Sequence, residues 1–448
     1  MHKEFSKVLA GFRHFVGRMH PTKLVLFGYA WYIVLGWLFL SLPIAQQGPG
    51  TKAIDNLFIA TSAVSTTGLT PISITDDYTW FGQLVVLILI QVGGVGYMTF
   101  GSFIILARKQ ALPLTQSKIG KTVFSLPGSF DLGHFIRCVI AFTILIESVG
   151  AVVLFFIFRA AGQPDAVWSA VFHSVSSFCT AGFSIYNNSL EGFSGNFWLT
   201  VTIATMSYLG AIGFIVFLDF WNMLTGRTQS ITLTSKIILW TTFWMSCTGT
   251  FLLFIGEPSL WAKPLDERIL TAFFQAMSAM TTVGFNTVGI GALSKSSALL
   301  LIILMVIGSS PSGTGGGLKC TTFSAFIGVM RSAIRGEQEV RFWNRPVPME
   351  RVWTAVGSVG FYLSALVIGT YLMEMTETSP FDQNFFEVAS ALGTVGLSMG
   401  VTPSLSNIGK LIIVLLMFCG RLGPLTFGMA LFGGPNTDDG KQDNDLAV

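Results

Sequence analysis

Charged side chains are scarce in this chain. Asp, Glu, Lys and Arg make up 11% of its 448 residues, while 51% are hydrophobic, and the mean hydropathy is +0.65. Soluble domains carry roughly a quarter charged residues, so this composition predicts a protein embedded in a lipid bilayer. The net charge of +3 is small and dispersed, and we therefore expect no nucleic-acid partner.

Motifs for metal binding, nucleotide binding and catalysis are also missing. The chain has five cysteines and no C-x-x-C pair, so we expect neither disulfides nor a zinc site. No G-x-G-x-x-G fingerprint opens a soluble helix, and neither a His/Glu metal motif nor a Walker loop is present. We therefore expect no enzyme and no prosthetic group.

One short motif occurs four times without gaps. Each copy has a glycine, a threonine two residues earlier, a serine six earlier and a phenylalanine ten earlier. The glycines are Gly68, Gly182, Gly284 and Gly396. The period of about a hundred residues is too long for a solenoid. The repeat instead predicts four equivalent modules around one axis.

Each motif lies in the same pattern of hydrophobic runs: a long run, a short run that leads into the motif, and a second long run. The long runs are 24–42, 81–107, 135–158, 197–221, 237–255, 298–330, 352–373 and 409–432, and the short runs are 56–65, 166–178, 266–280 and 382–392. A spanning helix needs ~20 apolar residues, so the short runs must enter the membrane and turn back. The sequence predicts an all-α integral membrane protein with eight membrane spans and four re-entrant pore helices around one pseudo-fourfold ion pore.

These runs also divide the chain. We expect pore units at 24–107, 134–222, 234–332 and 351–433, with cytoplasmic ends at 1–23 and 434–448. With that orientation the inside segments hold 18 of the Lys and Arg residues and the outside segments six, as the positive-inside rule requires. Asp55, Asp266 and Asp382 stand near the starts of three short runs and suit helix N-caps.

The motif itself predicts a selectivity filter. Irregular backbone survives in a membrane only where it is buried in protein or lines a watery path, and rings of backbone carbonyls can replace the hydration shell of a cation. Small packing residues would explain a lone glycine, but not three further residue types at fixed offsets in four copies. The predicted filter residues are Thr66, Thr67, Gly68, Leu69, Thr180, Ala181, Gly182, Phe183, Thr282, Val283, Gly284, Phe285, Thr394, Val395, Gly396 and Leu397.

The run 298–330 is interrupted by a glycine-rich segment, 308–317. Five glycines and a proline in ten residues cannot hold a helix, so we predict a loop that obstructs the pore below the filter. A nucleotide P-loop is excluded because Leu318 separates the last glycine from the lysine and membrane spans flank the segment. The predicted gate residues are Gly308, Ser309, Ser310, Gly313, Thr314, Gly315, Gly316, Gly317, Lys319 and Arg421.

Two basic residues near this loop need an explanation. A cation at the membrane centre costs at least ~2.5–3.5 kcal/mol, so Arg421, halfway along the last run, should have a partner or a purpose. It can bond the loop's freed carbonyls, present an electrostatic barrier to cations, or do both. We expect Lys319 to snorkel toward the cytoplasmic side, with Asp219 as a candidate partner.

The arrangement of four span–pore helix–span units with one glycine per filter resembles the Trk/Ktr/HKT superfamily of potassium transporters. The resemblance covers residues 24–433, and segments 393–403 and 420–426 are most similar to the Ktr-type membrane subunit. It implies potassium selectivity, because glycine fills all four filters, with K⁺ bound by the filter backbone and Na⁺ as a candidate activator. In the family, the loop that matches 308–317 is the intramembrane gate.

The resemblance also implies partners and a location. We expect a homodimer with one pore per protomer, and a separate cytoplasmic subunit that binds nucleotide and moves the gate, in the inner membrane of a bacterial cell. The predicted function is potassium uptake through a gated, channel-like pore. The alternative is a secondary transporter that couples potassium to sodium or protons. Carriers usually show inverted repeats, whereas these four units share one orientation, which favours the pore.

Overall fold

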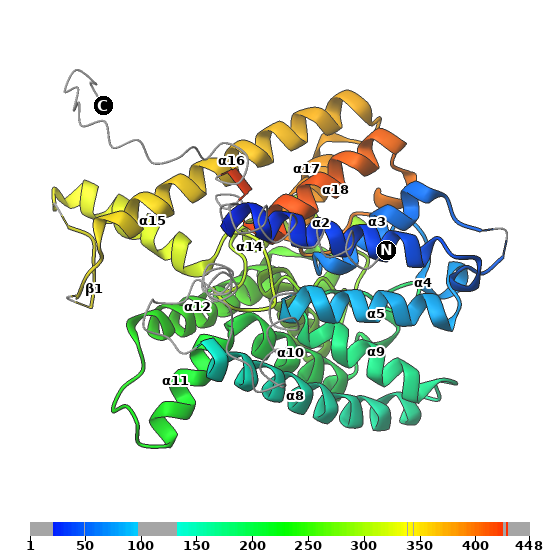
Figure 1. The fold of residues 1–448 in the computed structure, drawn as a ribbon, viewed down its shortest axis with the longest axis horizontal. Helices are drawn as coiled ribbons and strands as arrows, with labels where there is room; N and C mark the ends of the chain where they lie inside the picture. Colours follow the sequence, from blue (N-terminus) through cyan, green and yellow to red (C-terminus); the bar gives the residue numbers. More distant parts are fainter. Residues whose placement is uncertain are drawn as a thin grey trace, which may run out of the picture.

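The computed structural model describes residues 21–48, 50–96, 132–337, 339–343, 345–423 and 427–428. The regular structure of these residues is helical, apart from one short hairpin of β1 (Arg341–Phe342) and β2 (Arg345–Pro346), and long helices run side by side through the molecule (Figure 1). The predicted all-α class is therefore confirmed. The short elements are η1 (Pro43–Ala45), α4 (Ile74–Asp77), η2 (Glu191–Phe193), η3 (Pro258–Leu260), η4 (Ile290–Ala292) and η5 (Thr402–Ser404).

The first helix of every unit is long. These helices are α2 (Pro21–Leu40), α8 (Leu132–Ala160), α12 (Leu233–Gly256) and α16 (Met349–Thr376). Among the described residues, they are the four single helices long and apolar enough to cross a membrane. Even α2, with 20 residues, measures about 30 Å, the thickness of a bilayer's hydrocarbon core. In Figure 1, α16 runs along the upper edge of the molecule and α8 along the lower edge.

The second helix of every unit is short or broken. These helices are α5 (Trp80–Val95), α10 (Phe197–Ile212) followed by α11 (Phe214–Leu224), α14 (Lys295–Val306) followed by α15 (Cys320–Arg335), and α18 (Asn407–Leu422). The predicted interruption of 298–330 is confirmed. The predicted span over 197–221 contains a bend that the sequence did not indicate, because α10 and α11 meet at 89°. Residues 97–107 of the predicted span 81–107, and most of 424–433, lie outside the described residues.

The predicted pore helices lie between the first and second helices of each unit in the chain. They are α3 (Ala53–Val64), α9 (Ala166–Phe178), α13 (Leu265–Thr281) and α17 (Phe381–Gly393), close to the predicted bounds. At 12 to 17 residues, they are shorter than a spanning helix. The repeated phenylalanine anchors each of them, since Phe58, Phe172, Phe274 and Phe386 are all fully buried.

The starts of the second helices are capped in the same way in all four units. The cap oxygen accepts a backbone N–H three residues on, as is usual for Ser, Thr and Asn. The pairs are Thr79 with Gly82, Asn196 with Leu199, Ser294 with Ser297 and Ser406 with Gly409, at 3.0–3.3 Å.

The prediction that aspartates cap the starts of the pore helices is wrong. Asp55, Asp266 and Asp382 lie within the first turn instead, where a carboxylate still complements the helix dipole.

Polar contacts join each unit to the next at the outer end of the pore helices. In each case, a polar side chain at or just before the start of one unit's second helix bonds a side chain in the first turns of the next unit's pore helix. The pairs are Gln83 Oε1 with Trp168 Nε1 at 2.7 Å, Ser194 Oγ with Glu267 Oε1 at 3.2 Å, Lys295 Nζ with Asp382 Oδ2 at 3.1 Å, and Lys410 Nζ with Asp55 Oδ1 at 2.7 Å. The last pair joins unit four back to unit one and closes a ring.

The ion pair between Lys410 and Asp55 is the buried member of that ring, with side-chain exposures of 8% and 7%. Removing one partner leaves an uncompensated buried charge, so we expect Asp55→Asn to destabilise the fold by about 3–5 kcal/mol. Asp382→Asn is the matched control, because it removes the equivalent pair at an exposed site and should change stability little. Thermal unfolding of both variants in detergent checks this, and equal shifts in midpoint would contradict it.

Candidate functional site

The four motif glycines surround one axis at a single level. A Cβ atom added to Gly68 would lie 3.2 Å from the Cα of Gly182, and one added to Gly182 would lie 3.1 Å from the Cα of Gly284. One added to Gly284 would lie 3.1 Å from the Cα of Gly396, and one added to Gly396 would lie 3.1 Å from the Cα of Gly68. The four contacts form a closed ring, and the main chains approach so closely that no side chain fits at these positions.

A backbone carbonyl oxygen lies at each contact between neighbouring units of this ring. The atom nearest to each added Cβ is the backbone oxygen of the residue just before the next glycine. These oxygens belong to Thr67, Ala181, Val283 and Val395. Four partial negative charges therefore meet at one level, in the arrangement that replaces the water shell of a cation.

The threonines that precede this level adopt an unusual backbone conformation. Thr66, Thr180, Thr282 and Thr394 have φ between 48° and 59°, a region that β-branched residues rarely occupy. The cause is the end of the pore helix: in every unit the N–H after the threonine bonds the serine carbonyl five residues earlier, at 2.8–3.1 Å. This is the longer bond of a Schellman cap, whose left-handed position is usually a glycine. The strain of about 1–3 kcal/mol per residue is typical of functional sites.

The repeated serine also ties the helix to the segment around the motif glycine (the predicted filter segment) through its side chain. Ser62 Oγ and Ser390 Oγ each accept the N–H of the filter glycine at 3.0 Å. Ser176 Oγ and Ser278 Oγ instead donate to the carbonyl oxygen of the residue after the glycine, at 2.8 and 2.5 Å. That residue is anchored behind the ring, since Leu69, Phe183, Phe285 and Leu397 are at most 1% exposed. Filter backbone groups are thereby fixed by the unit's own pore helix.

The threonine hydroxyls form a second layer next to the carbonyl ring. Thr282 Oγ1 and Thr394 Oγ1 are buried and have no hydrogen-bond partner among the described residues. A buried oxygen without a partner is costly, and a bound cation would satisfy it. Thr66 and Thr180 instead bond the glycine-rich loop.

The glycine-rich loop 308–317 is held by the break between α10 and α11. The N–H groups of Ser310 and Thr314 bond the carbonyls of Ala211 and Gly210, each at 3.1 Å, and a straight helix would use these carbonyls itself. Phe214 N in turn donates to Ser312 O at 3.2 Å. Gly213 makes the bend with φ 89°, and a Cβ there would lie 2.6 Å from Pro311 O. The unpredicted bend therefore accommodates the loop.

Three consecutive loop residues lie against the four threonines. Thr314 Oγ1 lies 3.1 Å from Thr180 Oγ1, and Thr66 Oγ1 donates to Thr314 O at 3.4 Å. The atoms nearest to a Cβ added at Gly315 and at Gly316 are the hydroxyl oxygens of Thr282 and Thr394. The loop thus lies across the threonine side of the ring. Around it, Gly308 N bonds Leu318 O at 2.9 Å and Ser309 O accepts from Cys320 N at 3.2 Å, while Gly317 has φ 69°.

Arg421 makes the expected contact with this loop. Its Nη1 donates to Thr314 O and to Thr66 Oγ1, the latter at 2.9 Å. Its Nη2 donates to the carbonyls of Gly93 and Gly94 at the end of α5. One guanidinium from unit four therefore bonds both the loop of unit three and the helix end of unit one.

Lys319 does not snorkel as predicted. Its Nζ donates to Gly315 O at 2.8 Å, so the side chain folds back onto the loop, whose free carbonyl attracts it. The suggested partner Asp219 is also wrong, since Asp219 Oδ2 accepts from Thr232 N at 3.1 Å and from Ser235 Oγ at 2.5 Å at the start of α12. Both lysine and arginine thus bond the loop's backbone carbonyls.

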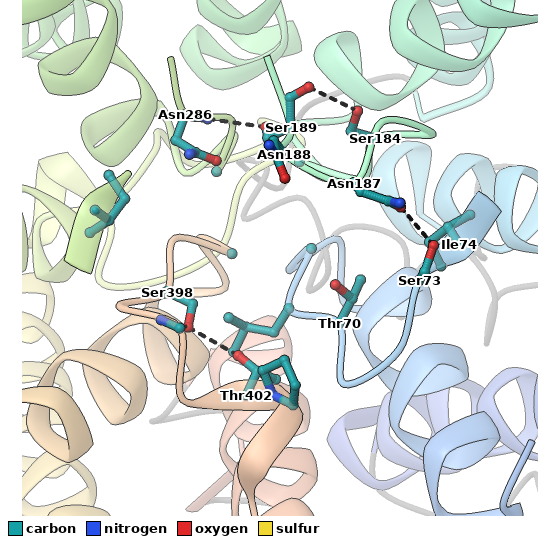
Figure 2. A pocket seen from close by; sticks show the side chains of 18 of the residues that line it. Thr70, Ser73, Ile74, Ser184, Asn187, Asn188, Ser189, Asn286, Ser398 and Thr402 are labelled. Atoms are coloured by element: carbon teal, nitrogen blue, oxygen red, sulfur yellow. Dashed lines mark hydrogen bonds between the residues drawn. The ribbon is translucent and has the colours of Figure 1, made fainter. Parts of the chain in front are cut away.

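On the other side of the ring, a cavity of about 530 Å³ opens over the glycines. Figure 2 shows that all four units contribute to its wall. The residue two positions after each glycine is polar in every unit and lines this mouth: Thr70, Ser184, Asn286 and Ser398. The sequence analysis missed these positions, although their shared polarity at a fixed offset was the signal for them.

The site and the fold together define a membrane protein with a four-part cation pathway. The model of the TrkH family, described as cation transport proteins, matches residues 32–431. The chain belongs to this family, and it is a transport protein rather than an enzyme. The resemblance drawn from the repeats is confirmed.

Known relatives match over most of their length. The chain is 31% identical to Ktr system potassium uptake protein B of Bacillus subtilis, covering 92% of each chain. It is 32% identical to the potassium/sodium uptake protein NtpJ of Enterococcus hirae, covering 92% of this chain and 93% of that one. The crystal structure of the potassium transporter TrkH from Vibrio parahaemolyticus has the same fold, with a TM-score of 0.72 at 19% identity over 92% of this chain and 84% of that chain.

The close approach at the ring makes a prediction about Gly284. Its φ of 80° and the neighbouring Val395 carbonyl leave no room for a methyl group, so Gly284→Ala should destabilise the protein by about 1–3 kcal/mol or more. Gly192→Ala is the control, because a Cβ there meets nothing within 4 Å. Thermal unfolding in detergent checks both, and a Gly284→Ala protein as stable as the control would argue against the ring.

Proposed function

We propose that this chain takes up potassium across a cell membrane through a gated, selective pore along the axis of the glycine ring. The observation that carries the proposal is the closed ring, in which four main chains present carbonyl oxygens at one level with no side chain between them. Oxygen rings of this kind compensate an alkali cation for its lost water. The names of the relatives from Bacillus subtilis and Enterococcus hirae support potassium as the transported ion.

In this proposal the two sides of the ring have different tasks. A hydrated cation enters the polar mouth, loses water at the carbonyls, and then reaches the threonine hydroxyls. There it meets the loop residues 314–316 and the positive charge of Arg421. The loop must leave this position before the ion can pass, so loop 308–317 and Arg421 together form the gate.

The alternative is coupled transport of potassium with sodium or protons. The observation in favour of coupled transport is the name of the Enterococcus hirae relative, a potassium/sodium uptake protein. The two mechanisms differ in rate and stoichiometry. Purified protein in a planar bilayer should give unitary potassium currents if it is a pore. A strict ion stoichiometry without unitary current would replace the pore with a carrier.

We further propose that the chain is the multi-pass membrane subunit of a Ktr-type system in a bacterial inner membrane. The name of the relative from Bacillus subtilis supports membership of such a system. The subunit would form a homodimer with both termini in the cytoplasm, would be regulated by a separate nucleotide-binding subunit, and could take Na⁺ as an activator. Growth of an uptake-deficient strain at limiting potassium, with and without a cytoplasmic partner, tests this assignment.

The gate can be tested without the partner. Deleting residues 309–317, or the change Arg421→Ala, should raise potassium flux into proteoliposomes, because either change removes contacts that hold the loop against the threonines. We expect an increase of roughly tenfold, the equivalent of about 1.4 kcal/mol. Unchanged or lower flux, at normal protein abundance, would count against the gate.

The filter can be tested at Gly68. Gly68→Ser adds a side chain at a position where the main chain of unit two lies within contact distance, so the ring must widen or distort and the oxygens fit K⁺ less well. We expect the flux ratio of potassium to sodium to fall. An unaltered ratio, measured with both ions in the same proteoliposomes, would contradict the assignment of Gly68 to the filter.

A further inference from the structure

A fifth position of the repeat lies behind the ring and differs from unit to unit. Nine residues before each glycine, next to the buried phenylalanine, the units carry Ile59, His173, Gln275 and Glu387. The three polar side chains are at most 2% exposed. Burying a polar or charged group is costly unless it is hydrogen-bonded, so the partners of these groups are informative.

Each of the three polar groups reaches the segment just outside the ring. His173 Nε2 lies 2.9 Å from Ser184 Oγ, and Gln275 Nε2 donates to Thr287 Oγ1 at 3.2 Å. Glu387 Oε2 accepts from Ser398 Oγ at 2.8 Å. These side chains therefore connect the pore helix to the chain that leaves the filter, two or three residues beyond the glycine.

The contact at Glu387 has a defined direction. Ser398 Oγ accepts the N–H of Gly400 at 3.0 Å and has one proton of its own, which it donates to Glu387 Oε2. Thr402 Oγ1 lies 3.1 Å from Ser398 Oγ and donates to Glu387 Oε1. Both carboxylate oxygens thus act as acceptors, a role that an amide fills at only one of its two positions.

No described cation is bonded to this carboxylate. Four charged groups on the elements packed against α17 have other partners: Lys295 bonds Asp382, Lys410 bonds Asp55, Arg421 bonds Thr314, and Glu374 accepts from Asn384. The other two, Glu350 and Arg351, lie in the first turn of α16. Glu387 is therefore a buried carboxylate held by two hydroxyls of the filter's outer segment. Hydrogen bonds to charged acceptors are stronger than those between neutral groups. The contact of Glu387 with Ser398 and Thr402, which we call the Glu387 strut, should therefore be the strongest of the three contacts between a pore helix and the segment beyond the glycine.

We propose that Glu387 is a positioning residue for ion selection: it holds the unit-four quarter of the ring in register by tying Ser398 and Thr402 to the pore helix. The inference rests on the proposed function of the ring. Ser398 is two residues from Gly396, so a strut at Ser398 fixes the direction in which the filter strand leaves the ring. The carboxylate touches no transported ion and acts through the backbone.

The test compares Glu387→Gln, Ser398→Ala and the double variant in proteoliposomes, with the ratio of potassium to sodium flux as the readout. Each single change should lower the ratio by roughly fivefold, the equivalent of losing one net hydrogen bond. The double variant should lower it no further, since both changes remove the same strut. Glu374→Gln is the matched control, because this exposed carboxylate of the same unit bonds only the start of the pore helix.

Thermal unfolding separates selectivity from stability. An unchanged flux ratio in Glu387→Gln, or effects that add in the double variant, would overturn the inference. A ratio that falls only in proportion to lost thermal stability would do the same. If Glu387→Gln does not fold, Ser398→Ala and Thr402→Val carry the same prediction. A wild-type protein without potassium-selective flux would instead refute the proposed function.

Discussion

The mutual approach of four main chains at Gly68, Gly182, Gly284 and Gly396 is the constraint on which this structure depends. Backbone N–H groups at that level must be satisfied from behind so that the carbonyl oxygens remain available in front. The repeated serine accepts the glycine N–H in units one and four, and in units two and three it donates to the carbonyl oxygen of the residue after the glycine. The left-handed threonine follows from the same need, because it turns the chain out of the pore helix and into the ring.

The broken second helices are the consequence of placing a loop beneath that ring. An unbroken helix offers no free carbonyls, whereas α10 ends at Ile212 and leaves those of Gly210 and Ala211 for the loop. The end of α5 likewise offers the carbonyls of Gly93 and Gly94 to Arg421. Among the described residues, the single helices long and apolar enough to cross a membrane are the four first helices, and none of these helices supplies carbonyls to the loop.

The sequence predicted those features that repeat without change. Fixed offsets identified the short helices and the residues that meet in the glycine ring, and the glycine-rich run identified the loop. The bend at Gly213 was not predictable, because it depends on contact with a loop about a hundred residues later. The direction of the Lys319 side chain was not predictable for the same reason. Its partner is the carbonyl of Gly315, which is available only because the loop is not helical. The repeat position of Glu387 was not identified from the sequence, because the four units carry different types of side chain there.

Two departures from fourfold symmetry concern the loop beneath the ring. A single loop, from unit three, covers all four threonines, since 314–316 span the ring. A single guanidinium, from unit four, links that loop to unit one. If the loop is the gate, as proposed, this asymmetry has an advantage: four equal loops would have to move together, whereas one loop held by a few hydrogen bonds needs a single release. Net bonds of this kind contribute about 0.5–1.5 kcal/mol each, so under the proposed function a regulatory partner would have to overcome only the small sum of a few such bonds to move the loop.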